Sequence, residues 1–137
     1  MGGGSYVRVL VDSNFLIAPF LLGWDVFSEL GRVIGGRYEV IVLDRVIDEL
    51  MKLAEKGGRR GKLARAALSL VEVRGFRVCP SGVEGGGVDD AVFDYAKREG
   101  CVVATNDAKL RRRLRRVGVP VVFLRQGRRL FLDGEIL

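Results

Sequence analysis

The sequence contains no histidine and only two cysteines among its 137 residues. Without histidine, Ser–His–Asp and Cys–His catalysis are excluded, and so are the imidazole ligands of the usual zinc sites. Cys79 and Cys101 are not spaced as metal ligands, and each borders an apolar run, so we expect two buried free thiols rather than a disulfide. Hydrolytic chemistry in this chain must therefore use carboxylate, hydroxyl, lysine or arginine side chains.

Long hydrophobic segments are also lacking. The apolar run at residues 15–24 has ten residues, whereas a membrane-spanning helix needs about 20. Residues 1–5 lack the charged start and apolar centre of a signal peptide, so we expect a disordered tail or a cloning remnant there. These features predict a cytoplasmic protein with no membrane partner, in which residues 6–137 form a single domain.

Aromatic residues make up only 8% of the chain, whereas basic residues outnumber acidic ones by 23 to 17. Arginine accounts for 18 of the 23 basic residues, and its guanidinium group binds phosphate through paired hydrogen bonds. This composition suits a polyanion that is recognised through its backbone and shape rather than by base stacking. For each arginine cluster taken alone, a solvated charged face is the alternative interpretation. The arginines that we expect to contact nucleic acid are Arg59, Arg60, Arg111, Arg112, Arg115 and Arg116.

Short β-branched runs alternate with helical patterns along the chain. Predicted strands lie at 6–11, 38–43, 76–79, 101–104 and 120–124, and predicted helices at 26–34, 44–55, 62–71, 89–99 and 107–117. A short or broken helix is expected at 15–23, and residues 125–137 are expected to fold as a hairpin or edge strand over Gly127 and Gly134. We interpret Asp25 and Asp44 as helix caps. The alternation predicts a single three-layer α/β/α domain with a central, mainly parallel sheet of about five strands.

Acidic residues occur near the junctions where a predicted strand ends and a helix begins. Asp12 follows the first strand and Asp107 the fourth, while Glu49 lies early in the helix after the second strand. Asp89 or Asp90 begins the helix after the third strand. Helix N-termini attract acids for capping alone. The carboxyl ends of parallel strands nevertheless share one edge of the sheet, so four acids converging there indicate a functional site.

Helical position separates neighbouring acids. Glu49 shares its helical face with apolar residues and should lean toward the sheet, whereas Asp48 shares its face with charged residues and should point outward. By the same reasoning Asp89 lies over apolar positions and Asp90 over polar ones. Geometry thus favours Asp89 as the inward acid, although either residue could reach a site from the first turn.

At these residues the chain resembles a known family. Asp12-Ser13-Asn14, Glu49-Leu50, Asp89-Asp90-Ala91 and Ala104-Thr105-Asn106-Asp107 resemble the four acidic motifs of PIN domains (PilT N-terminus nucleases). The resemblance covers residues 7–124 and is nearest to archaeal PIN proteins and to rRNA-processing or VapC-type members. It implies a Mg²⁺- or Mn²⁺-dependent endoribonuclease. In that family the third acid usually precedes a small residue, which points to Asp90 and leaves Asp89 and Asp90 both open.

The resemblance implies roles for the site residues. Asp12, Asp107 and one or both of Asp89 and Asp90 would be metal ligands, and Glu49 would complete the catalytic acids. Ser13 and Thr105 lie close enough in sequence to support the ligands through their hydroxyls, and Asn14 and Asn106 are further supporting residues. Mg²⁺ prefers hard oxygen ligands, and in a chain without histidine a metal ion is the group that can generate hydroxide near neutral pH.

Several alternatives can be compared. A phospho-receiver domain needs an aspartate after the third strand, where Cys79-Pro80 stands, and a haloacid-dehalogenase-type phosphatase needs one at position 14, where Asn14 stands. The turn after the first strand lacks a dinucleotide-binding glycine fingerprint. The serious alternative is a non-catalytic PIN-like RNA-binding or scaffold protein in ribosome assembly. The implied partners are RNA with either an antitoxin or a ribosome-assembly protein, and a homodimer is also open.

Overall fold

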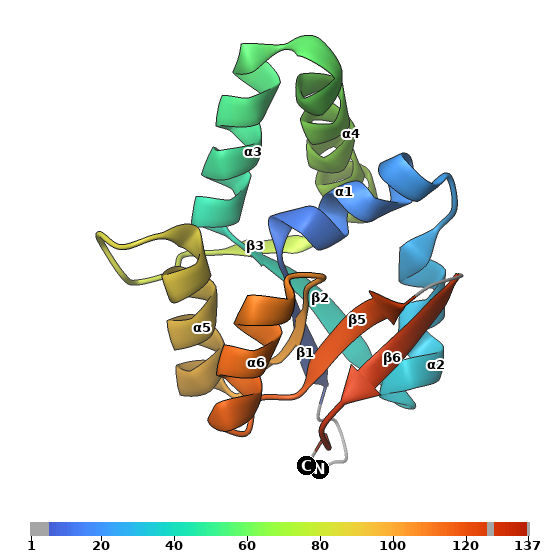
Figure 1. Ribbon diagram of the computed structural model, residues 1–137, viewed down its shortest axis with the longest axis vertical. Coiled ribbons are helices and arrows are strands. Elements are labelled where there is room, and N and C mark those ends of the chain that lie inside the picture. Colours follow the sequence, from blue (N-terminus) through green and yellow to red (C-terminus); the bar gives the residue numbers. More distant parts are fainter. Residues whose placement is uncertain (1–5, 126–127, 137) are drawn as a thin grey trace.

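A six-stranded sheet forms the centre of the computed structural model, which describes residues 6–125 and 128–136 (Figure 1). The spatial order of the strands is β3-β2-β1-β4-β5-β6. The first five strands are parallel, and β6 pairs antiparallel with β5. The strands are β1 (Val7–Val11), β2 (Tyr38–Leu43), β3 (Arg77–Cys79), β4 (Val102–Ala104), β5 (Val121–Arg125) and β6 (Arg129–Asp133).

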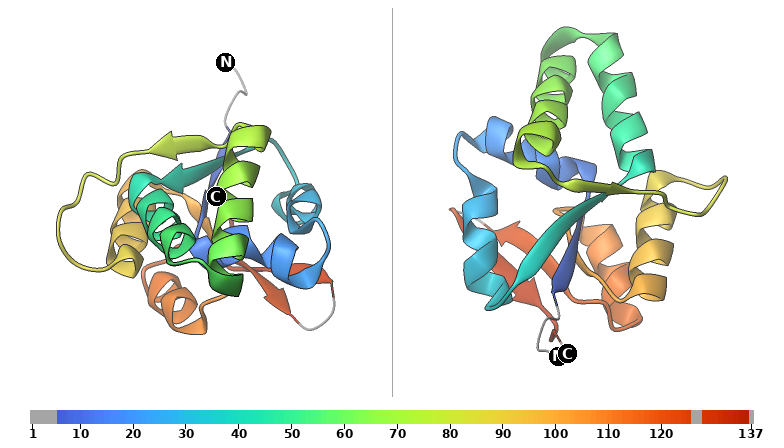
Figure 2. Two further views of the ribbon diagram at one scale, coloured as in Figure 1. Left: turned by 90° about the horizontal axis from the view of Figure 1, so that it is seen from above. Right: turned by 180° about the vertical axis from the view of Figure 1, so that it is seen from behind.

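Helices cover both sides of this sheet. They are α1 (Ser13–Leu22), the 3-10 helix η1 (Val26–Glu29), α2 (Leu30–Ile34), α3 (Asp44–Lys56), α4 (Gly58–Arg74), α5 (Val88–Glu99) and α6 (Ala108–Arg116). Helices α5 and α6 lie together on one side of the strands and α2 lies on the other, while α3 and α4 form a helical hairpin beyond the carboxyl edge (Figures 1 and 2). Within residues 6–125 and 128–136, none of the helices has the length and apolar composition that crossing a membrane requires.

The predicted α/β architecture is confirmed. The sixth strand comes from the tail that was expected to form a hairpin or edge strand: β6 pairs with β5 from Val121↔Asp133 to Arg125↔Arg129. Gly127 and the predicted tail at residues 1–5 lie outside the described residues. The hairpin adds an antiparallel edge to an otherwise parallel sheet, as is common in large mixed sheets.

Several predicted boundaries were wrong for identifiable reasons. The helix predicted from residue 62 begins at Gly58, because Gly57 and Gly58 adopt positive φ angles of 72° and 69° and turn the chain within two residues. The helix around Pro19 is short but unbroken, since its buried residues pack into the core. Residues 26–34 divide into η1 and α2, and Asp25 caps η1 through the N–H of Phe27 at 3.1 Å.

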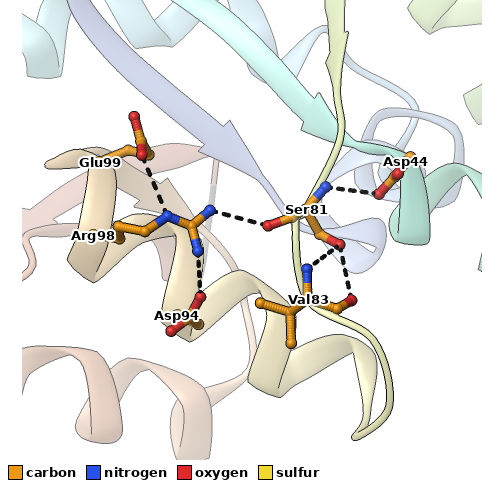
Figure 3. A network of polar contacts seen from close by, with 6 residues as sticks. All are labelled: Asp44, Ser81, Val83, Asp94, Arg98 and Glu99. Carbon is orange, nitrogen blue, oxygen red and sulfur yellow. Dashed lines mark hydrogen bonds and ion pairs between the residues drawn. The ribbon is translucent and has the colours of Figure 1, made fainter.

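Asp44 was interpreted as a helix cap, but it is the first residue of α3. Its carboxylate accepts the N–H of Arg45 at 2.7 Å and the N–H of Ser81 at 3.1 Å. The carbonyl of Ser81 in turn accepts a hydrogen bond from the guanidinium of Arg98 at 3.0 Å, so Ser81 is held from both sides (Figure 3). Asp44 therefore ties the start of α3 to the segment after β3, which places α3 beside the beginning of α5.

The core is densest along the two central strands. Leu10 and Val11 in β1 and Val103 and Ala104 in β4 are fully inaccessible to solvent. Cys79 and Cys101 are free and buried, as predicted. The first polar residues after the buried ends of β1 and β4, Asp12 and Thr105, are themselves buried, and the candidate site is built around them.

One close approach near the C-terminus gives a test of the fold. Gly134 has φ +103°, and a Cβ added there would lie 2.5 Å from Nη1 of Arg115, whose guanidinium contacts Asp133 at 3.2 Å. Gly134→Ala should lower the free energy of unfolding by about 1–3 kcal/mol, because the left-handed conformation becomes strained and Arg115 must move.

Urea unfolding would measure this change. Gly36→Ala is the matched control, because Gly36 has no positive φ and no atom within 4 Å of an added Cβ. Equal stabilities of the two variants would show that the packing of Arg115 against Gly134 does not constrain the tail.

Candidate active site

Asp12 is a carboxylate buried at the carboxyl end of β1. Only 3% of its surface is exposed. Its Oδ1 accepts the N–H of Ser13 at 2.9 Å, and its Oδ2 accepts the hydroxyl of Thr105 at 2.8 Å and the amide Nδ2 of Asn14 at 3.3 Å. Because β1 and β4 are neighbours, Thr105 lies directly beside Asp12 although it is 93 residues away in sequence.

The amides and hydroxyl around Asp12 connect three strand ends. Thr105 is fully buried, and its Oγ1 also accepts the N–H of Asp107 at 3.2 Å and the Nδ2 of Asn14 at 3.4 Å. Oδ1 of Asn14 accepts the N–H of Asn106 at 3.0 Å, and Oδ1 of Asn106 accepts the N–H of Leu124 in β5 at 2.9 Å. The ends of β1, β4 and β5 are thus held in one arrangement by side chains that the sequence predicted as supporting residues.

Ser13 plays a different part from the one expected. In the hydrogen bonds found among the described residues, it contributes its backbone N–H to Asp12 and no hydroxyl contact. The conformation explains this, because Asp12 is the N-cap of α1 and Ser13 is the first helical residue. Support of Asp12 through a hydroxyl therefore comes from Thr105 alone.

Burial and neighbouring charges together perturb the acids. Burial raises the pKa of Asp12 to about 6, and the charges of Asp89 and Glu49 add to this, while hydrogen bonds from Thr105 and Ser13 oppose it. The pKa of Asp89 is also raised, first by partial burial and then by the charges of Asp107, Glu49 and Asp90. Carboxylates from four separate elements therefore interact electrostatically at one edge of the sheet.

Glu49 points inward, as its helical position predicted. Its Oε1 is buried, and of the buried side-chain polar atoms in the described part of the chain it is the one without a hydrogen-bond partner. Asp48, the next residue along α3, is exposed. A buried carboxylate oxygen without a donor is energetically costly, and a cation is the kind of group that would satisfy it.

Asp89 and Asp90 differ in what they contact. Oδ1 of Asp90 forms an ion pair with Arg113 at 2.6 Å, and Oδ2 accepts the N–H of Gly87 at 3.3 Å. The hydrogen bond from Arg113 is the main reason that the pKa of Asp90 lies below its ordinary value. Asp89 is the one whose pKa is raised by the other acids. Both aspartates line the cavity that Glu49 also lines, and they differ in that the carboxylate of Asp90 is paired with Arg113.

Asp107 serves as the N-cap of α6. Its Oδ1 accepts the N–H groups of Lys109 at 2.9 Å and Leu110 at 3.2 Å. The charge of Asp107 also raises the pKa of Asp89, so this carboxylate belongs to the acidic group as well. Capping and participation in the site are not alternatives for this residue, because one oxygen accounts for both capping bonds.

The acids line adjoining openings and do not meet in one cluster. Glu49 and Asp89 line a cavity of about 410 Å³, and Asp107 lines a neighbouring one of about 250 Å³. Among residues 6–125 and 128–136, no three acidic or cysteine side chains are close enough to enclose a metal ion. The donors nevertheless suit a hard divalent cation: they are all carboxylate oxygens, one of them buried without a partner and two with a raised pKa.

The arginines of α6 divide into engaged and exposed residues. The guanidinium of Arg111 lies 4.0 Å from the ring centroid of Phe123 and 3.8 Å from Asp133, and Arg115 contacts the same aspartate. Arg112 and Arg116 are exposed. Of the four arginines predicted on this helix, two are therefore held by intramolecular contacts.

Arg59 and Arg60, the other two arginines predicted to contact nucleic acid, are exposed where α3 turns into α4 (Figure 1). Other basic residues, which were not predicted from the sequence, lie nearer to the acidic residues. A cavity of about 370 Å³ beside Glu49 is lined by Arg45, Lys52 and Lys56. Lys52 and Lys56 follow Glu49 at positions i+3 and i+7, so helical spacing was the signal that could have identified them.

A larger cavity, of about 440 Å³, lies at the opposite edge of the sheet among residues such as Tyr6, Cys101 and Pro120. It contains no group of acids, and burial raises the pKa of Cys101 to about 11, so that thiol is not activated. We therefore assign the chemistry to the acidic edge.

The raised pKa of Asp12 predicts how stability depends on pH. Its carboxyl binds a proton more tightly in the folded protein, so the folded state holds more protons between pH 3.8 and about 6. The free energy of unfolding in EDTA should therefore fall as pH rises through this window, by about 3 kcal/mol from this group.

Denaturant unfolding at several pH values would test this expectation. Asp12→Asn should lose that component of the decrease, whereas Asp48→Asn, a change at an exposed acid on α3, should keep it. Identical pH profiles for wild type and Asp12→Asn would show that burial does not perturb this carboxyl.

Comparison with known proteins adds an independent line of argument. A model of the PIN like domain family matches residues 9–127. The chain is 32% identical over 134 residues to Ribonuclease VapC9 of Archaeoglobus fulgidus, a match that covers 96% of this chain and 94% of that protein. It is 28% identical over 121 residues to rRNA-processing protein fcf1 of Schizosaccharomyces pombe, covering 87% of this chain and 59% of that protein.

Among solved structures, the PIN domain endonuclease Utp24 superimposes with a TM-score of 0.78 at 26% identity, covering 94% of this chain and 92% of that one. The family match spans most of the chain and includes all four acidic motifs that suggested the resemblance. This chain belongs to the family of PIN-like domains.

Proposed function

We propose that this protein is an endoribonuclease that hydrolyses RNA phosphodiester bonds with the help of Mg²⁺ or Mn²⁺. The observation that carries the proposal is the group formed by Asp12, Glu49, Asp89 and Asp107, in which burial and the neighbouring carboxylates raise the pKa of Asp12 and of Asp89, and in which one oxygen of Glu49 is buried without a partner. The relatives' names, a ribonuclease, an rRNA-processing protein and an endonuclease, support RNA as the substrate. A cation site without its cation brings negative charges close together, and the repulsion between them is relieved when the cation binds.

In this proposal Asp12, Asp89 and Asp107 would hold the metal, and Glu49 would complete the set of catalytic acids. When bound, the ion supplies a Lewis acid that polarises the phosphate and generates hydroxide from water. Asp90 has a separate role, because its ion pair with Arg113 neutralises it beside the site. The proposal thus chooses Asp89 over Asp90, as helical position suggested and family pattern did not.

The remaining residues of the site hold the carboxylate of Asp12 in position or attract the RNA. Thr105 and Asn14 occupy Oδ2 of Asp12 and the N–H of Ser13 occupies one position on Oδ1, so the acceptor position that is left on this carboxylate lies on Oδ1 and is fixed in direction. The basic side chains of Arg45, Lys52 and Lys56 line the opening beside Glu49, where they would bind the phosphate backbone of the incoming RNA. Without them, four carboxylates would repel a polyanion.

The biological setting is either that of a VapC-type toxin, with an antitoxin as partner, or that of an RNA-processing factor with ribosome-assembly partners. Relatives of both kinds match most of this chain. A non-catalytic RNA-binding or scaffold role is the alternative that the cleavage assay below tests, and a homodimer would be tested by measuring the mass of the protein in solution.

The catalytic assignment predicts which carboxylates are needed for RNA cleavage. Asp12→Asn, Asp89→Asn and Asp107→Asn should each lower RNA cleavage by on the order of 100-fold or more, since each removes a charge from the site without changing its shape. Asp90→Asn should keep most of the activity, because Asp90 is paired with Arg113. Cleavage of a labelled RNA in Mg²⁺ or Mn²⁺, and its loss in EDTA, would be followed on a gel.

Asp48→Asn controls for the change of charge on α3, and RNA binding measured in parallel controls for folding. Wild-type turnover in Asp12→Asn would refute the site. If Asp90→Asn is inactive while Asp89→Asn cleaves normally, the ligand assignment is reversed.

The exposed arginines of α6 should bind the phosphate backbone. Replacing Arg112 and Arg116 together by alanine should weaken binding to all RNA sequences alike, and should reduce the slope of log affinity against log salt by about 0.7 for each lost contact with a single strand. Arg115 is unsuitable for this test because it is held by Asp133.

Replacing Arg37 and Arg77 together by alanine, two exposed arginines outside α6, is the control that removes the same net charge. An unchanged salt slope in the double variant would show that Arg112 and Arg116 do not contact phosphate and are part of a solvated charged face.

A further inference from the structure

We propose that the cavity between the start of α6 and the end of β5 is a subsite for one unpaired nucleobase of the RNA, next to the acidic edge. The cavity has a volume of about 250 Å³, and its walls come from residues 105–108 with Arg111, Phe123, Leu124 and Arg125. This inference rests on the proposed function, because it concerns how the same RNA is held. It adds a stacking contact to a protein whose low aromatic content predicted recognition of backbone and shape alone.

A flat surface suited to a base is built into one wall of this cavity. The guanidinium of Arg111 lies 4.0 Å from the ring centroid of Phe123, and Asp133 contacts its Nε at 3.8 Å. Phe123 is only 9% exposed and the guanidinium of Arg111 lies over its ring, so we take the guanidinium as the accessible plane of this wall. Unstacked bases bind to arginine planes as well as to aromatic rings.

A second arginine lies over the same aromatic pair. Phe123 and Phe131 have ring centroids 6.1 Å apart, and the guanidinium of Arg125 lies 5.6 Å from the first and 5.2 Å from the second. Helix α6 and strands β5 and β6 lie next to one another in the fold (Figure 1). Arg125 thus places a positive charge at the same opening, where the phosphate attached to a stacked base would need one.

Polar groups for recognising the edge of a base are also present. Asn106 lines the cavity, and its Oδ1 is occupied by the N–H of Leu124 at 2.9 Å. That contact orients the amide and leaves its Nδ2 amino group as a donor for an acceptor on the base. The wall is therefore amphipathic in the way that ligand pockets usually are, with a planar face and a few fixed polar groups.

The position of the cavity connects it to the chemistry. Asp107 belongs both to the acidic group and to the wall of the cavity. A base bound here would therefore place an adjoining phosphate at the acidic edge. The ligand class is a nucleotide in a single-stranded or bulged segment, since a base that is stacked within a duplex cannot enter such a pocket.

A scan with abasic nucleotides would test the inference. The probe is a short single-stranded RNA in which one nucleotide at a time lacks its base, and binding is measured by fluorescence anisotropy with an Asp12→Asn protein that leaves the RNA intact. One position should be sensitive, with binding weakened by about 5- to 150-fold, and the other positions should change little. Arg111→Lys, which keeps the charge but removes the plane, should abolish most of that sensitivity.

The controls separate stacking from folding and charge. Arg37→Lys makes the same substitution at another arginine placed over an aromatic ring, Tyr6 at 5.5 Å, and should keep the sensitive position. Phe123→Tyr retains the ring beneath Arg111 and should keep it as well, whereas Phe123→Leu should lose it. If Phe123→Leu fails to fold, the pair Arg111→Lys and Arg37→Lys decides the matter.

Three results would overturn the inference. RNA that is bound and cleaved by the wild type with no abasic-sensitive position would remove the subsite and leave the proposed function intact. A sensitive position that persists unchanged in Arg111→Lys would place the base elsewhere. If the RNA is neither bound nor cleaved, the proposed function fails, and the subsite with it.

Discussion

The hydrogen bond from the buried hydroxyl of Thr105 to the buried carboxylate of Asp12 is the contact on which the rest of the site depends. It joins the ends of the two central strands at 2.8 Å, in a place where neither group can exchange its partner for water. Buried polar groups of this kind need their partners, because an unmade bond there costs the full desolvation of the group. The hydroxyl also accepts from Asn14 and Asp107, so the same atom sets the direction of the capped turn that begins α6. Asp12, Asp107 and the start of α6 are therefore fixed by a single buried hydroxyl.

Such an arrangement favours function over stability. Hydrogen bonds from Thr105 and Ser13 favour the charged form of Asp12, but burial and the charges of neighbouring acids outweigh them. The unpartnered oxygen of Glu49 adds to the same imbalance. A fold selected for stability alone would place neutral residues at these positions. The buried ends of β1 and β4 hold Asp12 and Thr105 in place against this repulsion.

Much of this could be predicted from the sequence, because strand ends and helix starts are local features. The β-branched runs located the strands, and the inward face of α3 distinguished Glu49 from Asp48 by spacing alone. What could not be predicted depends on partners distant in sequence. The pairing of Arg113 with Asp90 distinguishes the surroundings of two adjacent aspartates, and it joins α6 to α5 across 23 residues. Likewise Asp133 in β6 holds Arg111 and Arg115, and no pattern in α6 indicates it. The start of α4 was predicted wrongly for a local reason. Gly57 and Gly58 together indicate the end of a helix, but the second of them is already the first residue of α4.

The fate of these arginines changes how the net charge of +6 should be understood. Three of the five arginines on α6 are paired with Asp90 or Asp133, and these two carboxylates offset two of the positive charges of the helix, so only part of its charge can attract RNA at long range. The positive charge nearest the acids lies on both sides of them, in Arg45, Lys52 and Lys56 beside Glu49 and in Arg111 and Arg125 beside Asp107. A polyanion is repelled by the acids themselves, and interactions beyond about a Debye length are screened, so these flanking charges must act at contact distance. A strand held on both sides would have to cross the acidic edge between them. In this view the arginines and lysines determine where the RNA lies, and the acids determine what happens to it there.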